Sequence, residues 1–161
     1  EEGKYRKYNK FVFDQSKKKI TSFEGPNKNE LKRQEFDFEN CMHDILSIVY
    51  HLRNMDVERY GPGDSFPISV FLEEEYSLDV KVLENDSKKK IKGFGKFSTR
   101  VYEPQLIVGD VFDEAQTMTI YVSNDKNKLP VLIESPLIVG KVKAVLYDYR
   151  GLRYDLISKM N

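Results

Sequence analysis

Three side chains on one predicted helix are of the types used in nucleophilic catalysis, namely Asp44, Ser47 and His51. Ser47 and His51 are four residues apart, so a helix would place them on one face within reach of each other. Asp44 and His51 are seven residues apart, which at 1.5 Å per residue is about 10 Å along the helix axis. A catalytic triad requires the carboxylate to orient the imidazole directly. We therefore expect a solvated helix face here and no triad.

The other residues with chemical potential also have simpler structural explanations. Cys41 is the only cysteine, which rules out an internal disulfide, and we expect it to be a small, half-buried side chain. Glu73, Glu74 and Glu75 would diverge at the tip of a tight hairpin, so we interpret them as a solvated turn. Gly93-Phe94-Gly95 lacks the rest of a phosphate-binding fingerprint and has no helix after it. The sequence thus predicts no catalytic residue, cofactor or metal site, and we expect that the protein is not an enzyme.

Residues 41–54 form the only long segment with a helical period. Asn40 is the predicted N-cap, because its side-chain oxygen could accept a free backbone N–H. The apolar residues fall within one arc of about 120°, the pattern of a helix that faces a core. We predict an amphipathic helix over residues 40–54. Its core-facing residues would be Met42, Ile45, Leu46, Val49 and Leu52.

Arg53 interrupts this pattern because it lies inside the apolar arc, in the last turn. In one account its stem covers apolar surface while its head reaches the edge near the negative end of the helix dipole. In the other, a partly buried guanidinium pairs with a carboxylate or an anionic ligand. Tyr50 lies beside the arc. If a ligand lies beneath the helix, Tyr50 and Arg53 are its candidate contacts; otherwise both complete the core between helix and sheet.

Most other segments alternate between apolar and polar residues, as strands do. Short connections favour antiparallel pairing, and a sheet of nine or ten strands curls. We predict a mainly β fold, a curled antiparallel sheet that forms a half-barrel or incomplete barrel, with the amphipathic helix packed on its concave face. Lys88-Lys89-Lys90 would be exposed charge, and the tail after Gly151 a short helix or disordered. The predicted strands are 4–14, 18–24, 31–38, 66–72, 76–83, 97–103, 117–123, 131–134 and 141–149.

The composition limits the function classes. The 161 residues fit a single domain, 1–161. Lysine plus arginine and aspartate plus glutamate both number 26, so a broad basic surface for nucleic acid is not expected. No run approaches the 18 apolar residues of a transmembrane segment, and the first residues are not a signal peptide. The lack of disulfides suits the cytosol but is compatible with an envelope protein that has an adequate core.

Residues 44–53, followed by Pro62-Gly63-Asp64, resemble the core motif of an exported bacterial family of unknown function, numbered 3108 in the DUF series. The resemblance implies a periplasmic or cell-envelope protein whose signal peptide is removed or truncated, with this chain as the C-terminal portion of a longer exported protein. The family supplies no activity, so no catalytic role follows. Further matches, in order, are Tyr5-Arg6-Lys7-Tyr8, Phe13-Asp14, Gly95-Lys96-Phe97, Tyr121-Val122-Ser123-Asn124-Asp125, Leu129-Pro130-Val131 and Val139-Gly140.

Two functions follow as hypotheses. The first is a non-catalytic exported envelope protein whose curved sheet binds an apolar or amphipathic ligand or assists surface assembly, because curved sheets hold ligands in their mouths. The alternative is a protein–protein interaction or scaffold module that uses an exposed strand edge, since such edges recruit partner strands. The expected partner is an apolar or amphipathic small molecule or an envelope protein.

Overall fold

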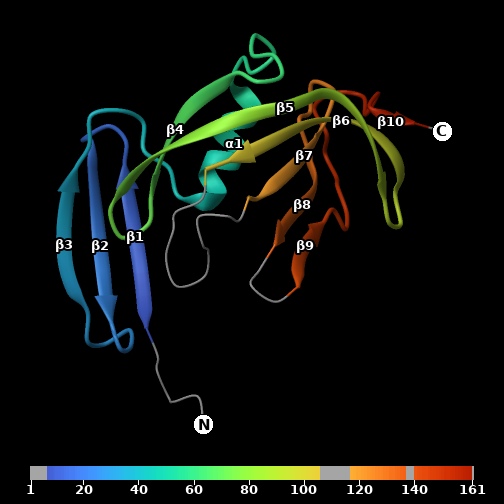
Figure 1. The fold of residues 1–161 in the computed structure, drawn as a ribbon. Coiled ribbons are helices and arrows are strands. Elements are labelled where there is room, and N and C mark those ends of the chain that lie inside the picture. Colours follow the sequence, from blue (N-terminus) through green and yellow to red (C-terminus); the bar gives the residue numbers. More distant parts are fainter. Residues whose placement is uncertain (1–6, 106–116, 137–139, 161) are drawn as a thin grey trace. The chain divides into compact units, whose positions relative to one another are not determined.

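The computed structural model describes residues 7–105, 117–136 and 140–160, and the chain in these ranges is mainly β, as predicted (Figure 1). The helix α1 (Ile45–Asn54) stands among ten described strands. Every strand pair whose register is defined is antiparallel. The strands are β1 (Tyr8–Asp14), β2 (Lys19–Gly25), β3 (Lys32–Asp37), β4 (Ser65–Phe71), β5 (Glu75–Ile91), β6 (Gly95–Pro104), β7 (Thr119–Ser123), β8 (Pro130–Pro136), β9 (Lys141–Val145) and β10 (Lys159–Met160).

The strands belong to two sheets, whereas the sequence predicted one. The first sheet has the order β1-β2-β3, and the second has the order β4-β5-β6-β7-β8-β9, with β10 paired to β6. The second sheet is not closed, since β4 and β9 are its two ends. An open, curled sheet of antiparallel strands agrees with the predicted incomplete barrel.

The chain forms two compact units that alternate along the sequence. Unit 1 contains the chain up to Leu46 together with Ser69–Tyr76, and unit 2 contains Ser47–Ile68 together with the chain from Ser77 onward. The chain therefore passes between the units three times. As a result, α1, β4 and β5 each contribute residues to both units.

The core of unit 1 is largely aromatic. Phe71 is buried at its centre and its ring meets Phe11 and Phe13 edge-on, with ring centres 5.5 and 6.2 Å apart. Such pairs contribute about 0.5–1.5 kcal/mol beyond the area they bury. The backbone N–H of Phe71 also donates to the carbonyl of His43, at 2.8 Å. The other buried residues of this core are Ile20, Phe38 and Met42.

The helix begins five residues later than predicted. The Asp44 carboxylate accepts the backbone N–H of Leu46 at 2.9 Å, so Asp44 takes the N-cap role that was assigned to Asn40. The preceding residues are extended, because His43 forms a bridge with Val70 of unit 1. Cys41, expected to be half-buried, is exposed.

This shift changes which helix residues are buried. Ile45 and Leu46 are 52% and 74% exposed, so their predicted core-facing role is wrong. Met42 is buried as predicted, but it precedes the helix and packs in unit 1. The buried helix residue is Ile48, which the predicted stripe omitted. Of the predicted stripe within the helix, Leu52 packs against the core of unit 2.

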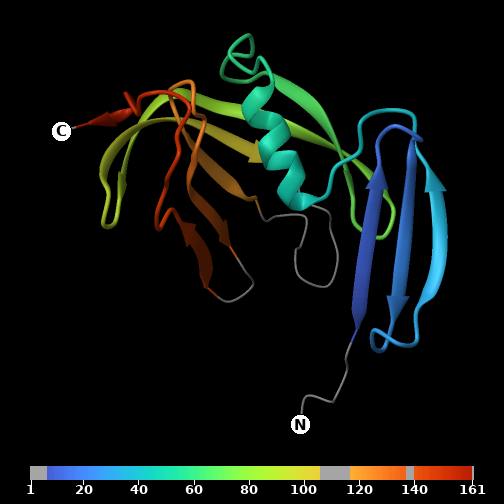
Figure 2. The same ribbon diagram turned by 180° about the vertical axis from the view of Figure 1, so that it is seen from behind.

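Unit 2 has two apolar clusters, which meet at β7. Ile120 belongs to the cluster that receives the helix through Leu52, and Tyr121 belongs to the other. Successive strand residues point to opposite faces, so the two clusters use different faces of β7. The second cluster is covered by the C-terminal segment, residues 146–158, which runs from β9 to β10 (drawn red in Figure 2). This segment is neither a helix nor disordered, in contrast to the prediction.

Candidate binding site on the C-terminal segment

The turn at residues 124–128 fixes the C-terminal segment. One carboxylate oxygen of Asp125 accepts the backbone N–H of Asn127 at 2.9 Å, and the other accepts both the N–H and the hydroxyl of Ser158. Asn127 is only 3% exposed, and its side-chain amide donates to the carbonyl of Tyr154 at 2.9 Å and accepts its N–H at 3.1 Å. These bonds join two segments about thirty residues apart in sequence and set the backbone position of Tyr154.

The same turn is attached to the end of α1. Arg53 donates from Nε to the backbone carbonyl of Asn127 at 2.8 Å. Lys128 donates from Nζ to the carbonyl of Met55 at 2.7 Å and forms an ion pair with Glu58. The turn is therefore a junction between the helix end and the C-terminal segment.

The two predicted ligand contacts lie away from the pockets described next. Tyr50 is 65% exposed, and the Arg53 guanidinium lies 5.8 Å from the centre of its ring. Arg53 bonds to a backbone carbonyl, which neither of the two sequence-based accounts anticipated. Asp44, one of the three helix residues considered for catalysis, serves as the helix cap.

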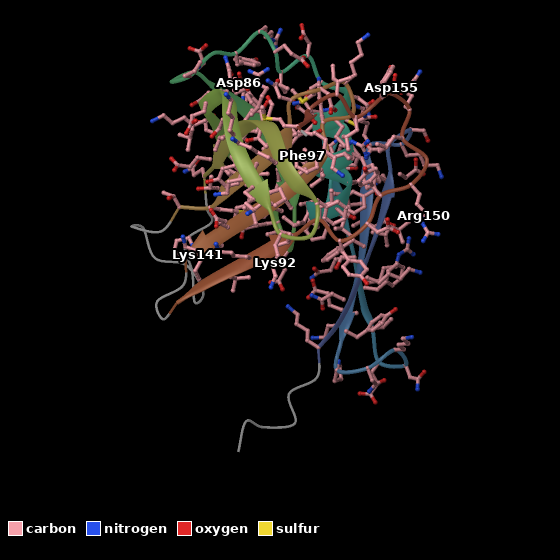
Figure 3. All side chains as sticks on the ribbon, turned by 90° about the vertical axis from the view of Figure 1, so that its right-hand side faces the viewer. Asp86, Lys92, Phe97, Lys141, Arg150 and Asp155 are labelled. Atoms are coloured by element: carbon pink, nitrogen blue, oxygen red, sulfur yellow. The ribbon has the colours of Figure 1, made fainter. Side chains whose placement is uncertain are left out.

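Two adjacent pockets flank the C-terminal segment. The first, here called the segment pocket, has a volume of about 790 Å³, and the second, the hairpin pocket, about 740 Å³. Arg150 lines both, and Figure 3 shows it on the C-terminal segment, with Lys92 at the tip of the β5–β6 hairpin. The segment pocket is lined by Lys126 and residues 149–157, and the hairpin pocket by Lys92, Gly93, Phe94, Val145, Leu146, Tyr147, Asp148 and Arg150.

The segment pocket combines aromatic surface with positive charge. The Lys126 ammonium lies 5.6 Å from the centre of the Tyr154 ring, and the Arg153 guanidinium lies 5.7 Å from the same centre. Within the ranges that the structure describes, no carboxylate is within ion-pair distance of either cation. Among the described residues of the lining, Asp155 is the only acidic one. Because Arg150 is paired with Asp148, the excess of positive charge in the pocket comes from Lys126 and Arg153.

The hairpin pocket is more apolar. Phe94 contacts Tyr149 with ring centres 6.0 Å apart, and Leu146 belongs to the adjoining apolar cluster. Arg150 is paired with Asp148, whose Oδ2 lies 3.1 Å from its Nε. An apolar group could therefore lie against Phe94 while its polar end reaches the shared Arg150.

A second charged cluster lies on the sheet itself. Glu134 of β8 accepts from Lys143 at 2.6 Å and from Lys89 at 3.1 Å, and the Lys89 ammonium lies 3.9 Å from the centre of the Tyr121 ring. The hydrogen bond from Lys143 is the main cause that lowers the pKa of Glu134 from 4.5 to about 2; partial burial opposes it, and Lys89 adds to the lowering. The prediction that Lys89 is exposed charge is thus wrong, because it lies partly buried in this ion-pair network.

The contacts in this cluster also show that the sheet is curled. β5 and β8 are separated by β6 and β7, which in a flat sheet places them about 14 Å apart at the usual strand spacing. Side chains stand roughly perpendicular to a sheet, so Lys89 and Glu134 would not meet across that distance. Their contact requires the sheet to bend toward the face that carries them.

The sequence did not predict the pockets, because it indicated a strand up to residue 149 and a short helix or disorder after Gly151, and neither forms there. The residues Tyr149-Arg150-Gly151-Leu152-Arg153-Tyr154 alternate aromatic, basic and apolar side chains, and this was the available signal. This stretch is short, and Asn127, which binds its residue Tyr154, is far away in sequence. The net charge of the whole chain does not reveal a local cluster of basic residues.

The fold and these pockets define a mainly β protein with an open, curled antiparallel sheet and mixed aromatic–basic surface pockets. Residues 1–147 match the model of the family described as Protein of unknown function (DUF3108), and the chain belongs to that family. No curated protein and no solved structure gives a significant match. Among the described residues, no helix is long and apolar enough to cross a membrane, and no three His, Cys, Asp or Glu residues are grouped to hold a metal ion.

Proposed function

We propose that this protein is a non-catalytic binding protein for an amphipathic ligand, which it holds in the segment and hairpin pockets. The observation that carries the proposal is the adjacency of the two pockets, which share Arg150 and combine apolar lining with positive charge. Their volumes, about 790 and 740 Å³, fall in the range of small-molecule sites. Each apolar group that a ligand buries there contributes roughly 25 cal/mol per Å² removed from water.

The proposal moves the ligand from the predicted contacts, Tyr50 and Arg53, to the C-terminal segment. Arg53 is engaged with Asn127 and so supports the site indirectly. A ligand would place its apolar part against Phe94 and the apolar side chains of residues 145–146, with its polar end near Arg150. No group in this arrangement is required to react.

The binding test uses isothermal titration calorimetry with dodecyl maltoside and dodecyl phosphate, each below its micelle concentration. We expect saturable 1:1 binding of at least one of them. Phe94→Ala should weaken it by about tenfold or more, since burial of an aromatic ring contributes roughly 1.5–3 kcal/mol. Tyr50→Ala is the matched control and should leave the affinity unchanged. Absence of saturable binding of both amphiphiles, or equal effects of the two variants, would contradict the proposal.

We further propose that the protein is exported and acts in the periplasm or cell envelope. The support is the family resemblance, which implies an exported protein. The test is fractionation of the natural host, with an antibody against this chain and with cytoplasmic and periplasmic marker proteins. Recovery of the chain with the cytoplasmic marker alone would refute the location.

A second candidate function is partner binding at the β9 edge. All five residues of β9 are exposed, and β9 ends the seven-stranded sheet. Edge strands offer free backbone groups to a partner strand, although Lys141 and Lys143 are of the type that discourages unselective pairing. A photo-crosslinking residue at Val142 should trap a defined partner in the host, and one at Tyr50 should not. Equal labelling at both positions would count against this function.

A further inference from the structure

We propose that Lys126 and Arg153, together with the ring of Tyr154, form an anion-binding subsite in the segment pocket, so that the amphipathic ligand carries a phosphate, sulfate or carboxylate group. This inference rests on the proposed function and specifies the polar end of its ligand. The two cations come from different parts of the chain, the 124–128 turn and the C-terminal segment. They meet at one ring because Asn127 fixes the backbone of Tyr154.

Two positive charges lie close together at the Tyr154 ring. Each cation lies less than 6 Å from the same ring centre, so the two positive charges are at most about 11 Å apart. A contact with an aromatic face contributes about 0.5–1 kcal/mol for one exposed cation, but a second cation at the same ring adds repulsion. A bound anion offsets this repulsion, and Arg can bind a phosphate or carboxylate through two parallel hydrogen bonds.

Two acidic side chains, Asp125 and Asp155, lie near these cations in the sequence. Asp125 precedes Lys126 directly, yet both its oxygens are occupied by hydrogen bonds from Asn127, Ser123 and Ser158. Arg150 is paired with Asp148, so Asp155 is the one carboxylate of the described lining that faces Lys126 and Arg153. The described lining of this pocket therefore keeps an excess of positive charge, although the whole chain has a net charge of zero.

The backbone of the subsite is fixed before a ligand binds. Asn127 and Ser158 are 3% exposed, and their hydrogen bonds hold the segment at Tyr154 and again at Ser158. A binding site whose backbone is already fixed loses less conformational entropy when the ligand arrives. Only the ends of the two long cationic side chains have to adjust.

The experiment compares three probes by isothermal titration calorimetry at low and physiological salt: inorganic phosphate, dodecyl phosphate and the neutral dodecyl maltoside. The test variant is Lys126→Gln with Arg153→Gln. The matched control is Lys81→Gln with Lys32→Gln, which removes two exposed charges from residues that line neither pocket. We expect the unmodified chain and the control to bind dodecyl phosphate at least tenfold more tightly than dodecyl maltoside. The test variant should bind both amphiphiles equally.

Equal affinity for the two amphiphiles in the unmodified chain, or a preference for phosphate that persists in the test variant, would overturn the subsite. The proposed function would survive either result, because an amphiphile would still bind. Conversely, if neither amphiphile binds but inorganic phosphate does and the test variant loses it, the subsite stands and the amphipathic ligand is refuted. Loss of binding in the control variant as well would show a nonspecific charge effect and overturn the subsite.

Discussion

Substitution of Glu134 by Gln should remove a pH-dependent part of the stability. The folded-state pKa of about 2 lies below the ordinary 4.5, chiefly because Lys143 donates a hydrogen bond to the carboxylate. At about 1.4 kcal/mol per tenfold change in acidity, this difference corresponds to roughly 3 kcal/mol. Lys143 is 53% exposed and solvent screens its charge. We therefore expect Glu134→Gln to lower the free energy of unfolding by about 1–2 kcal/mol at neutral pH.

The sign follows from proton binding. Between about pH 5 and pH 2 the unfolded chain binds a proton at Glu134 more readily than the folded chain, so stability rises with pH in this window. The contribution is complete above the unfolded-state pKa of 4.5 and is lost as pH falls toward about 2. The unmodified chain should thus exceed Glu134→Gln in stability at pH 7, and the two should converge near pH 2.

The assay is urea unfolding followed by far-UV circular dichroism at several pH values, since the chain contains no tryptophan. Hydrogen exchange of the β8 and β9 amides adds a local measurement in unit 2. Glu75→Gln is the control, because Glu75 is exposed and has no ion pair among the described residues. A stability difference for Glu134→Gln that stays constant from pH 7 to pH 2.5 would refute the reasoning.

Three other predictions concern packing and attachment. Ile48→Ala should lower the free energy of unfolding by about 2–4 kcal/mol and Leu46→Ala by less than 1, measured by urea unfolding. Equal effects would show that Leu46 is part of the core, as the sequence predicted. Phe71→Ala should lower the free energy of unfolding by about 3–5 kcal/mol and speed amide hydrogen exchange in β1 and β2 of unit 1. Unchanged exchange in these strands would contradict the central position of Phe71. Asn127→Ala should lower the free energy of unfolding by about 1–3 kcal/mol and raise the rate of amide hydrogen exchange in residues 150–158. If these amides stay protected, the hydrogen bonds of Asn127 do not hold the segment.

The strands were predictable because their apolar residues alternate over long enough stretches. β2, for example, was predicted as residues 18–24 and is found at Lys19–Gly25. β5 was underestimated, since its charged second half carries no apolar alternation and its register shifts at two places. Long-range pairing with β6 extends this strand where local propensity alone would end it.

The helix start shows a different limit. Asn40 and Asp44 are both good N-caps, and the sequence offers no means of choosing between them. The choice depends on His43, whose carbonyl accepts the N–H of Phe71, about thirty residues away. That bond keeps the chain extended up to Asp44.

The candidate site was not predictable for the same reason. Asn127 and Tyr154 are joined only in the folded chain, and so are Lys89 and Glu134. A zero net charge is compatible with a locally basic pocket, because charges of opposite sign are used elsewhere in ion pairs. The aromatic and basic residues at 149–154 become informative only once their backbone is known to be fixed.

The alternation of the two units along the chain has a practical consequence. No single cut of the chain yields either unit intact. Phe71, at the centre of the core of unit 1, lies in the sequence between the two segments that form unit 2. An expression fragment that ends at Leu46 would leave its aromatic side chains without their central partner and should be insoluble. Dissection of this protein therefore calls for point substitutions or for a fragment rejoined through an added linker.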